Sequence, residues 1–115
     1  MIVGSSKNLE AIVVNHPSAK DSKMRVLVGE QEGWDSHVMR VVEVDENGYT
    51  PKHSHPWPHI NYMLEGEGEL MIEGVNHPVK AGSYAYVPSD SLHQFRNKGK
   101  GTFKFICIVP KEGHK

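Results

Sequence analysis

The sequence is poor in several features that define common classes of protein. It has a single cysteine, Cys107, so no disulfide can form within the chain. Near the N-terminus the only apolar run is residues 11–14, which is too short for the core of a secretory signal. No stretch approaches the roughly 18 apolar residues of a membrane-spanning helix. We therefore expect a cytoplasmic protein without a membrane partner.

An excess of charge of either sign is also missing. Lys and Arg number 13, and Asp and Glu number 14, which gives a net charge of −1. Because there is no dense basic run and no strongly basic pI, nucleic acid is not an expected partner. A small molecule is the partner that we expect instead.

Long helices are missing as well, since no segment has a convincing helical period over ten or more residues. Short alternating or β-branched stretches, separated by Gly, Pro, Asn and Asp, predict strands. The expected strands are residues 9–14, 24–28, 36–44, 59–64, 69–73, around Val79, 82–87, 93–96 and 102–109. Turns are expected at 45–48 and 74–77, and a turn at 65–68 is expected to join 59–64 and 69–73 in a hairpin.

This spacing of strands is typical of an all-β fold, an antiparallel sandwich or barrel. A chain of 115 residues with 37% hydrophobic content can form one domain with a modest core. We expect a single domain over residues 1–115, with the barrel over about 38–109. The strands within residues 9–28 are expected at the sheet edge or in a dimer interface, so a homodimer is the expected assembly.

Histidine, in contrast, is abundant, with 8 residues. His53, His55 and His59 fall within one short stretch. Side chains alternate in an extended segment, so His53 and His55 point the same way, and Pro56 and Pro58 keep the links to His59 extended. Neutral imidazole is the commonest protein ligand for borderline transition metals, so this cluster predicts a metal site. Surface positions are expected for His16, His37, His77 and His114.

A second motif follows downstream, where Gly82, Pro88, Asp90, His93 and Asn97 have the spacing G-x5-P-x-D-x2-H-x3-N. It supplies a fourth histidine at the start of a predicted strand. Together with the first cluster it resembles the cupin family, whose motifs are written G-x5-H-x-H-x3,4-E-x6-G and G-x5-P-x-G-x2-H-x3-N. The resemblance covers about residues 38–109 and implies a cupin-type jelly-roll barrel.

The chain departs from the family pattern at three positions. Gly48 is separated from His53 by four residues rather than five, and Asp90 replaces a glycine in a turn where a positive φ would favour glycine. His59 replaces the usual glutamate. The resemblance therefore implies the four-histidine type of small single-domain cupin, whose metal ligands here would be His53, His55, His59 and His93.

Four neutral imidazoles would leave the 2+ charge of a metal uncompensated, which favours anionic or enolate-like ligands. They would also leave two positions open on an octahedral ion, where substrate and dioxygen can bind side by side. One divalent ion, manganese or iron, fits this chemistry best. Nickel and copper are alternatives, and zinc would indicate a structural or non-redox site.

Alternation along the strands predicts which side chains surround the metal. Alternation from His59 predicts that Asn61 points inward. There it is either a hydrogen-bond partner of a metal ligand or a polar residue of the barrel with its own hydrogen bonds satisfied. Cys107 either lines the pocket or is an ordinary core cysteine. Trp57 and Phe95 are either apolar walls or plain packing. The pocket residues that we expect are Trp57, Asn61, Phe95, Phe105 and Cys107.

The leading hypothesis is a metal-dependent oxidoreductase of dioxygenase type that acts on a small organic molecule. Neither motif contains a second carboxylate, and they supply no Ser/His/Asp set or phosphate-binding loop, so the metal would be the catalyst. Two alternatives stay open. One is a non-catalytic module that binds or senses a small molecule through the metal, and the other is a metal-dependent isomerase or decarboxylase.

Overall fold

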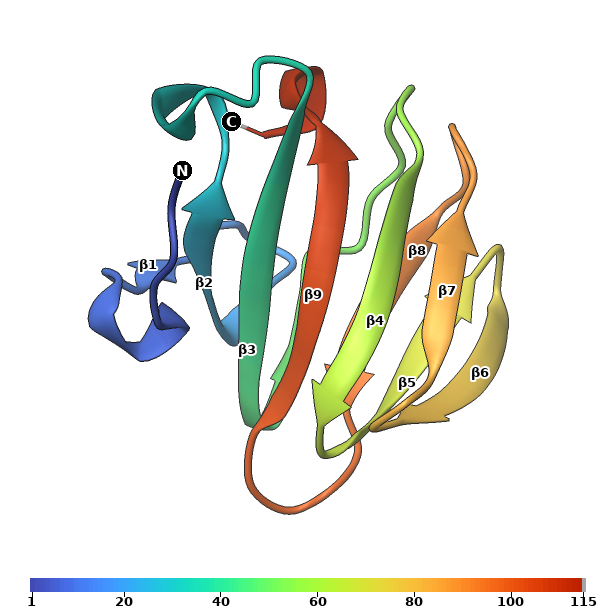
Figure 1. Ribbon diagram of the computed structural model, residues 1–115. Helices are drawn as coiled ribbons and strands as arrows, with labels where there is room; N and C mark the ends of the chain where they lie inside the picture. Colours follow the sequence, from blue (N-terminus) through green and yellow to red (C-terminus); the bar gives the residue numbers. More distant parts are fainter. Residues whose placement is uncertain (115) are drawn as a thin grey trace.

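The computed structural model describes residues 1–114, which are built mostly of β-strands (Figure 1). In chain order the strands are β1 (Ile12–Val13), β2 (Lys20–Val28), β3 (His37–Tyr49), β4 (His59–Glu65), β5 (Glu67–Ile72), β6 (Val75–Lys80), β7 (Tyr84–Val87), β8 (His93–Asn97) and β9 (Phe103–Pro110). The helical elements of the described residues are three short 3-10 turns, η1 (Ser6–Asn8), η2 (Glu30–Glu32) and η3 (Lys111–Gly113). The all-β fold predicted from the sequence is confirmed. Among residues 1–114, no helix has the length and apolar character needed to cross a membrane.

The strands form one antiparallel sheet in the order β6-β5-β8-β3-β9-β4-β7, with β2 paired to β3 and β1 paired to β2. In Figure 1, β3, β9 and β4 lie side by side, β8 and β5 pass behind β4 and β7, and β6 lies to the right of β7. The sheet therefore curls into a nearly closed barrel. The strand predicted over 9–14 is shorter in the structure, where only the two residues of β1 pair with β2.

The turn predicted at 45–48 is wrong, because β3 runs without interruption from His37 to Tyr49. Asn47 has a φ of 66°, and a Cβ on Gly48 would lie 2.7 Å from a backbone oxygen of β2. The register with β2 shifts at the same place. These residues therefore form a bulge that bends the strand instead of reversing it. The bend carries β3 from its pairing with β9 to a pairing with β8.

The hairpin predicted between 59–64 and 69–73 is also wrong. β4 pairs with β7 and β9, whereas β5 pairs with β6 and β8. At Gly66, where φ is +83°, an added Cβ would overlap the backbone oxygen of Thr102, so the chain crosses there between two parts of the barrel. The tight hairpin lies one strand later, where Glu73 and Gly74 adopt φ values of 49° and 80° between β5 and β6. The turn predicted at 74–77 is thus only two residues long and begins one residue earlier.

The predicted alternation along β4 and β9 is confirmed. Phe103, Phe105, Cys107 and Val109 of β9 are buried, as are Asn61 and Met63 of β4. The intervening residues of β4 face outward, with exposed fractions of 49% for Ile60 and Tyr62 and 42% for Leu64.

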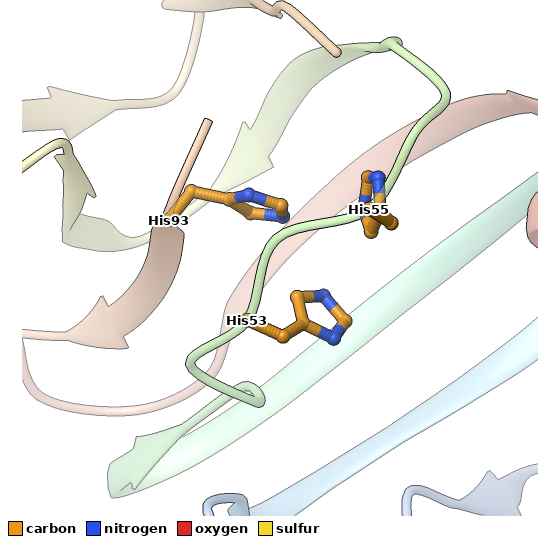
Figure 2. A group of neighbouring side chains, drawn as sticks. All are labelled: His53, His55 and His93. Carbon is orange, nitrogen blue, oxygen red and sulfur yellow. The ribbon is translucent and has the colours of Figure 1, made fainter. Parts of the chain in front are cut away.

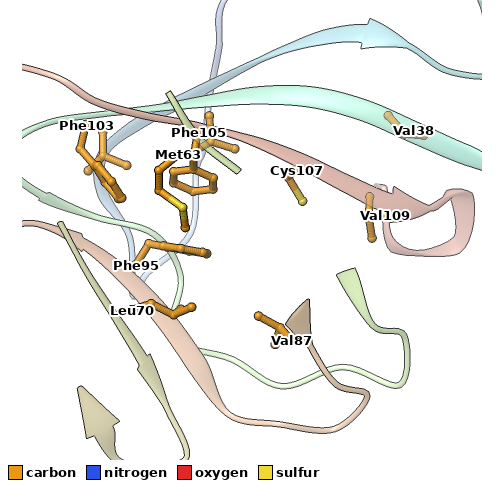
Figure 3. Close-up of a cluster of buried hydrophobic side chains, with 11 residues drawn as sticks. Val38, Met63, Leu70, Val87, Phe95, Phe103, Phe105, Cys107 and Val109 are labelled. Atoms are coloured by element: carbon orange, nitrogen blue, oxygen red, sulfur yellow. The ribbon is translucent and has the colours of Figure 1, made fainter. Parts of the chain in front are cut away.

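The apolar core is densest at one end of the barrel. Phe95 stacks on Phe105 with ring centroids 4.2 Å apart, and Phe103 lies 5.4 Å from Phe105. Figure 3 shows these rings gathered around Met63, whereas Val38 and Val109 lie further along β3 and β9. Each buried aromatic or aliphatic side chain stabilises the fold by roughly 1.5–3 kcal/mol. This packing supports β4 and β8, whose first residues are His59 and His93.

Candidate metal centre

The two histidine motifs meet because the loop after β3 is hydrogen-bonded to β8. The backbone groups of His53 and His93 exchange N–H···O bonds of 3.2 and 3.0 Å. The N–H of Asp90 also donates to the carbonyl of His55 at 2.7 Å. Asp90 has a φ of 65°, so the turn that carries glycine in the family pattern does require a positive φ. Aspartate tolerates this conformation better than most residues.

The four histidines gather in one place. The ring nitrogens of His53, His55 and His93 that can bind a metal lie within 4.8 Å of one another, and Figure 2 shows these three rings turned toward a common space. His59, the first residue of β4, lies outside this group of three, but its Nε2 is 3.2 Å from Nε2 of His93. The structure therefore brings the predicted ligands together, as three clustered rings and one adjacent ring.

Three of the rings are held by hydrogen bonds at Nδ1. The partners are the carbonyl of Trp57 for His55 at 2.8 Å, Oδ1 of Asn61 for His59 at 2.7 Å, and the carbonyl of Ser91 for His93 at 2.8 Å. An oxygen acceptor requires the ring to donate, so each ring carries a proton on Nδ1. Asn61 is itself oriented, because its Nδ2 donates to a backbone oxygen of β9 at 3.3 Å.

Burial keeps the imidazoles of His53, His59 and His93 uncharged. It lowers the pKa of His59 to about 3, with a further contribution from the neighbouring His93. It also lowers the pKa of His53 to about 4 and lowers the pKa of His93. A neutral ring with its proton on Nδ1 has a lone pair on Nε2. The lone pairs of His59 and His93 face each other, so a cation between the rings suits this donor set.

The histidines line a cavity of about 450 Å³. All five predicted pocket residues line it too, namely Trp57, Asn61, Phe95, Phe105 and Cys107. Trp57 stacks on His55 with centroids 5.1 Å apart, and Phe95, Phe105 and Cys107 belong to the core as well as to the cavity wall. No Asp or Glu is among the described lining residues. The cavity therefore combines imidazole nitrogens with largely apolar walls.

Sequence reasoning missed several residues of the lining, and two of these, Arg40 and His16, have basic side chains. His16 is exposed as expected, but its ring lies 6.2 Å from that of His53. Arg40 shares one face of β3 with the buried Val38 and Val42, and a charge in this otherwise apolar face is the signal that could have indicated a role. The surface position expected for His114 is wrong, because this side chain is partly buried against Arg40.

The chain belongs to the cupin family, because the model for the cupin domain matches residues 40–109. It is 31% identical to the polyketide cyclase RemF from Streptomyces resistomycificus, with a TM-score of 0.89 over 96% of this chain and 79% of that one. It is 30% identical over 78 residues to the dimethylsulfoniopropionate lyase DddW of Ruegeria pomeroyi. That match covers 67% of this chain and 51% of the lyase, so the chain spans about half the length of this relative.

A solved structure of a predicted oxalate decarboxylase from Thermotoga maritima has a TM-score of 0.85 over 95% of this chain and 98% of its own. At 22% identity, this likeness shows the fold alone. The cupin barrel expected from the resemblance is thus confirmed by the family match and by solved structures. Because one such scaffold supports many chemistries, the site has to define the function.

Proposed function

We propose that this cupin is an enzyme that binds one divalent transition metal through His53, His55, His59 and His93. The observation that carries the proposal is the orientation of the rings, because three of them donate from Nδ1 and leave Nε2 free to bind a cation. Manganese or iron remains our preferred metal, with nickel, copper or zinc as alternatives. When bound, the metal would polarise a substrate oxygen as a Lewis acid.

For the reaction, we propose a non-redox conversion of an oxygenated organic molecule, such as ring closure or elimination. Support comes from two of the relatives that are at least 30% identical over the matched region, which are described as a cyclase and a lyase. The dioxygenase reaction predicted from the sequence needs oxygen as a second substrate, and no feature of the cavity favours it over non-redox chemistry. It stays a prediction, which oxygen consumption would decide.

The chain's own residues would contribute positioning and exclusion of water. Asn61 fixes the ring of His59 through its hydrogen bond to Nδ1. Trp57, Phe95 and Phe105 supply apolar walls, which strengthen electrostatic interactions by keeping water away from the reacting group. A purely binding or sensing role would use the same walls, so turnover is what distinguishes an enzyme from a binding module.

The metal content of untagged protein tests the proposal directly. We expect close to one transition metal ion per chain in the wild type and a marked loss in His59→Ala. His77→Ala is the matched control, because His77 is exposed on β6 and outside the cavity. No metal in the wild type, or equal metal in both variants, would contradict the four-histidine site.

The reaction class is tested with the metal-loaded protein and a panel of enols, diketones and hydroxylated aromatic acids. Product formation without oxygen uptake is expected for non-redox chemistry. Oxygen uptake matched to product would instead support the dioxygenase, and saturable binding without any product would support the binding module.

The homodimer and the cytoplasmic location also stay proposals. In β1 the side chains of Ile12 and Val13 are 46% and 72% exposed at the edge of the sheet, where a second copy could cover them. Light scattering of the purified chain, compared with an Ile12→Lys variant, tests whether a dimer forms through this edge.

A further inference from the structure

Arg40 carries a positive charge into the wall of the histidine cavity. It extends from the inward face of β3, between the buried Val38 and Val42, and lines the same cavity as the four histidines. Two ion pairs form among residues 1–114, and neither involves Arg40. The described lining contains no Asp, Glu or Lys. Arginine stays protonated in proteins, so this guanidinium is the permanent charge of the cavity wall.

Among the residues that the structure describes, the hydrogen-bond partners of the guanidinium include no oxygen acceptor. Nη1 donates to Nδ1 of His114 at 3.1 Å, and Nη2 is 3.8 Å from Sγ of Cys107, a weak acceptor. The buried Nε has no partner among the described residues. His114 brings no negative charge, because an imidazole is either neutral or positive, and burial and the charge of Arg40 lower the pKa of His114 and favour its neutral form.

A partly buried guanidinium with a buried, unpaired Nε is costly unless an anion accompanies it. Most buried arginines meet a carboxylate of the protein, but the described lining offers none. The rest of the wall is apolar and partly aromatic, with Trp57, Phe95 and Phe105 facing a space of about 450 Å³. A molecule that fills this space can bury an apolar body against these rings and present an ionised oxygen to Arg40.

We propose that Arg40 binds the ionised oxygen of the molecule that enters the cavity, so that the substrate is an organic anion, a carboxylate or a phenolate, with a flat apolar body. The position of this substrate beside the histidines rests on the proposed function. The recognition of its charge by Arg40 does not need a metal. In a purely structural role, Arg40 would instead contribute to folding and leave ligand preference unchanged.

The probes for the test are 2-naphthoate and 2-naphthamide, which share a flat apolar body and differ in charge. Isothermal titration of the full chain, both as purified and after treatment with EDTA, measures the affinity for each. We expect naphthoate to bind at least about tenfold more tightly than naphthamide, the effect of one charge-assisted hydrogen bond. In Arg40→Met this ratio should fall to about one, because the charge is lost while much of the aliphatic length stays.

Arg96→Met is the matched control, since Arg96 is exposed on β8, lies over the ring of Tyr49 and does not line the cavity. It should keep the wild-type ratio.

Naphthol, titrated above and below the pH at which it ionises, separates the phenolate from the carboxylate as the preferred anion. If Arg40→Met does not fold, Arg40→Lys is used, and we expect a reduced ratio because lysine presents a single ammonium instead of a planar fork.

The outcomes separate this inference from the proposed function. A ratio near one in the wild type, or an unchanged ratio in Arg40→Met, would overturn the role of Arg40 whatever the metal content. A tenfold ratio that persists after EDTA treatment, in a protein that binds no transition metal, would support Arg40 and overturn the metal enzyme. Loss of stability in Arg40→Met with the ratio intact would show a structural role only.

Discussion

Nε2 of His59 lies 3.2 Å from Nε2 of His93, although each of the two rings donates from Nδ1 to an oxygen. Two lone pairs that face each other at this distance repel, unless a proton or a cation lies between them. Burial opposes the extra proton, since it lowers the pKa of both rings. A metal cation relieves the repulsion without protonating either ring, which is why this pair supports a metal centre.

The first prediction concerns the stability of the metal-free protein. In the unfolded chain a histidine takes up a proton near its ordinary pKa of 6.5, whereas in the folded chain His53 does so only near 4 and His59 near 3. Below pH 6.5 the unfolded state therefore binds more protons, and the free energy of unfolding should fall as the pH is lowered from 7.5 to 5. Urea unfolding at a series of pH values measures this slope.

In a His53→Gln/His59→Gln variant the same slope should be clearly smaller. His77→Gln, which changes an exposed histidine, should keep the wild-type slope. Equal slopes in the wild type and the double variant would show that these two rings are not neutral in the folded state.

The second prediction concerns Asn61, which accepts the hydrogen bond from Nδ1 of His59. Asn61→Ala removes the acceptor and frees the ring to rotate, so metal affinity should fall by roughly 10- to 100-fold. Asn61→Asp keeps an acceptor and should bind closer to the wild type. Competition with a coloured chelator measures the affinities, with the exposed Asn76→Ala as control. Equal affinity in Asn61→Ala and the wild type would exclude this positioning role.

The third prediction compares two glycines with similar backbone conformations. Gly66 and Gly74 have φ values of +83° and +80°, but only at Gly66 would an added Cβ overlap a backbone oxygen. Alanine at either position costs roughly 1–2 kcal/mol for the left-handed conformation. Gly66→Ala should cost distinctly more, because the chain crosses the barrel there. Chemical unfolding of both variants tests this, and equal losses would mean that the crossing relaxes freely.

Local patterns were enough to predict which side chains face the interior. Alternation from His59 placed Asn61 and Met63 inward, and alternation along β9 did the same for Phe105 and Cys107. A strand has only two faces, so one buried residue determines the direction of its neighbours. The histidine spacing likewise predicted a cluster, which the structure shows as neighbouring rings.

Strand pairing was not predictable in the same way. The residues around Gly66 have the composition of a hairpin turn. β4 nevertheless pairs with β7 and β9, and not with β3 or β5, its neighbours in the chain. Likewise, the polar residues 45–48 have turn composition but form a bulge within β3. In both places the local sequence predicts that the chain bends. Which strands then pair depends on how whole strands are buried in the barrel.

The sequence alone determined the strand content, the inward faces and the identity of the histidines, because these depend on neighbours a few residues away. Only the tertiary structure decided that Arg40 meets His114 and Cys107, which lie 74 and 67 positions further along the chain. Contacts over such separations depend on which strands pair and how the barrel closes. The histidine cluster was therefore visible in the sequence, whereas the charge that shares its cavity became apparent only in the folded chain.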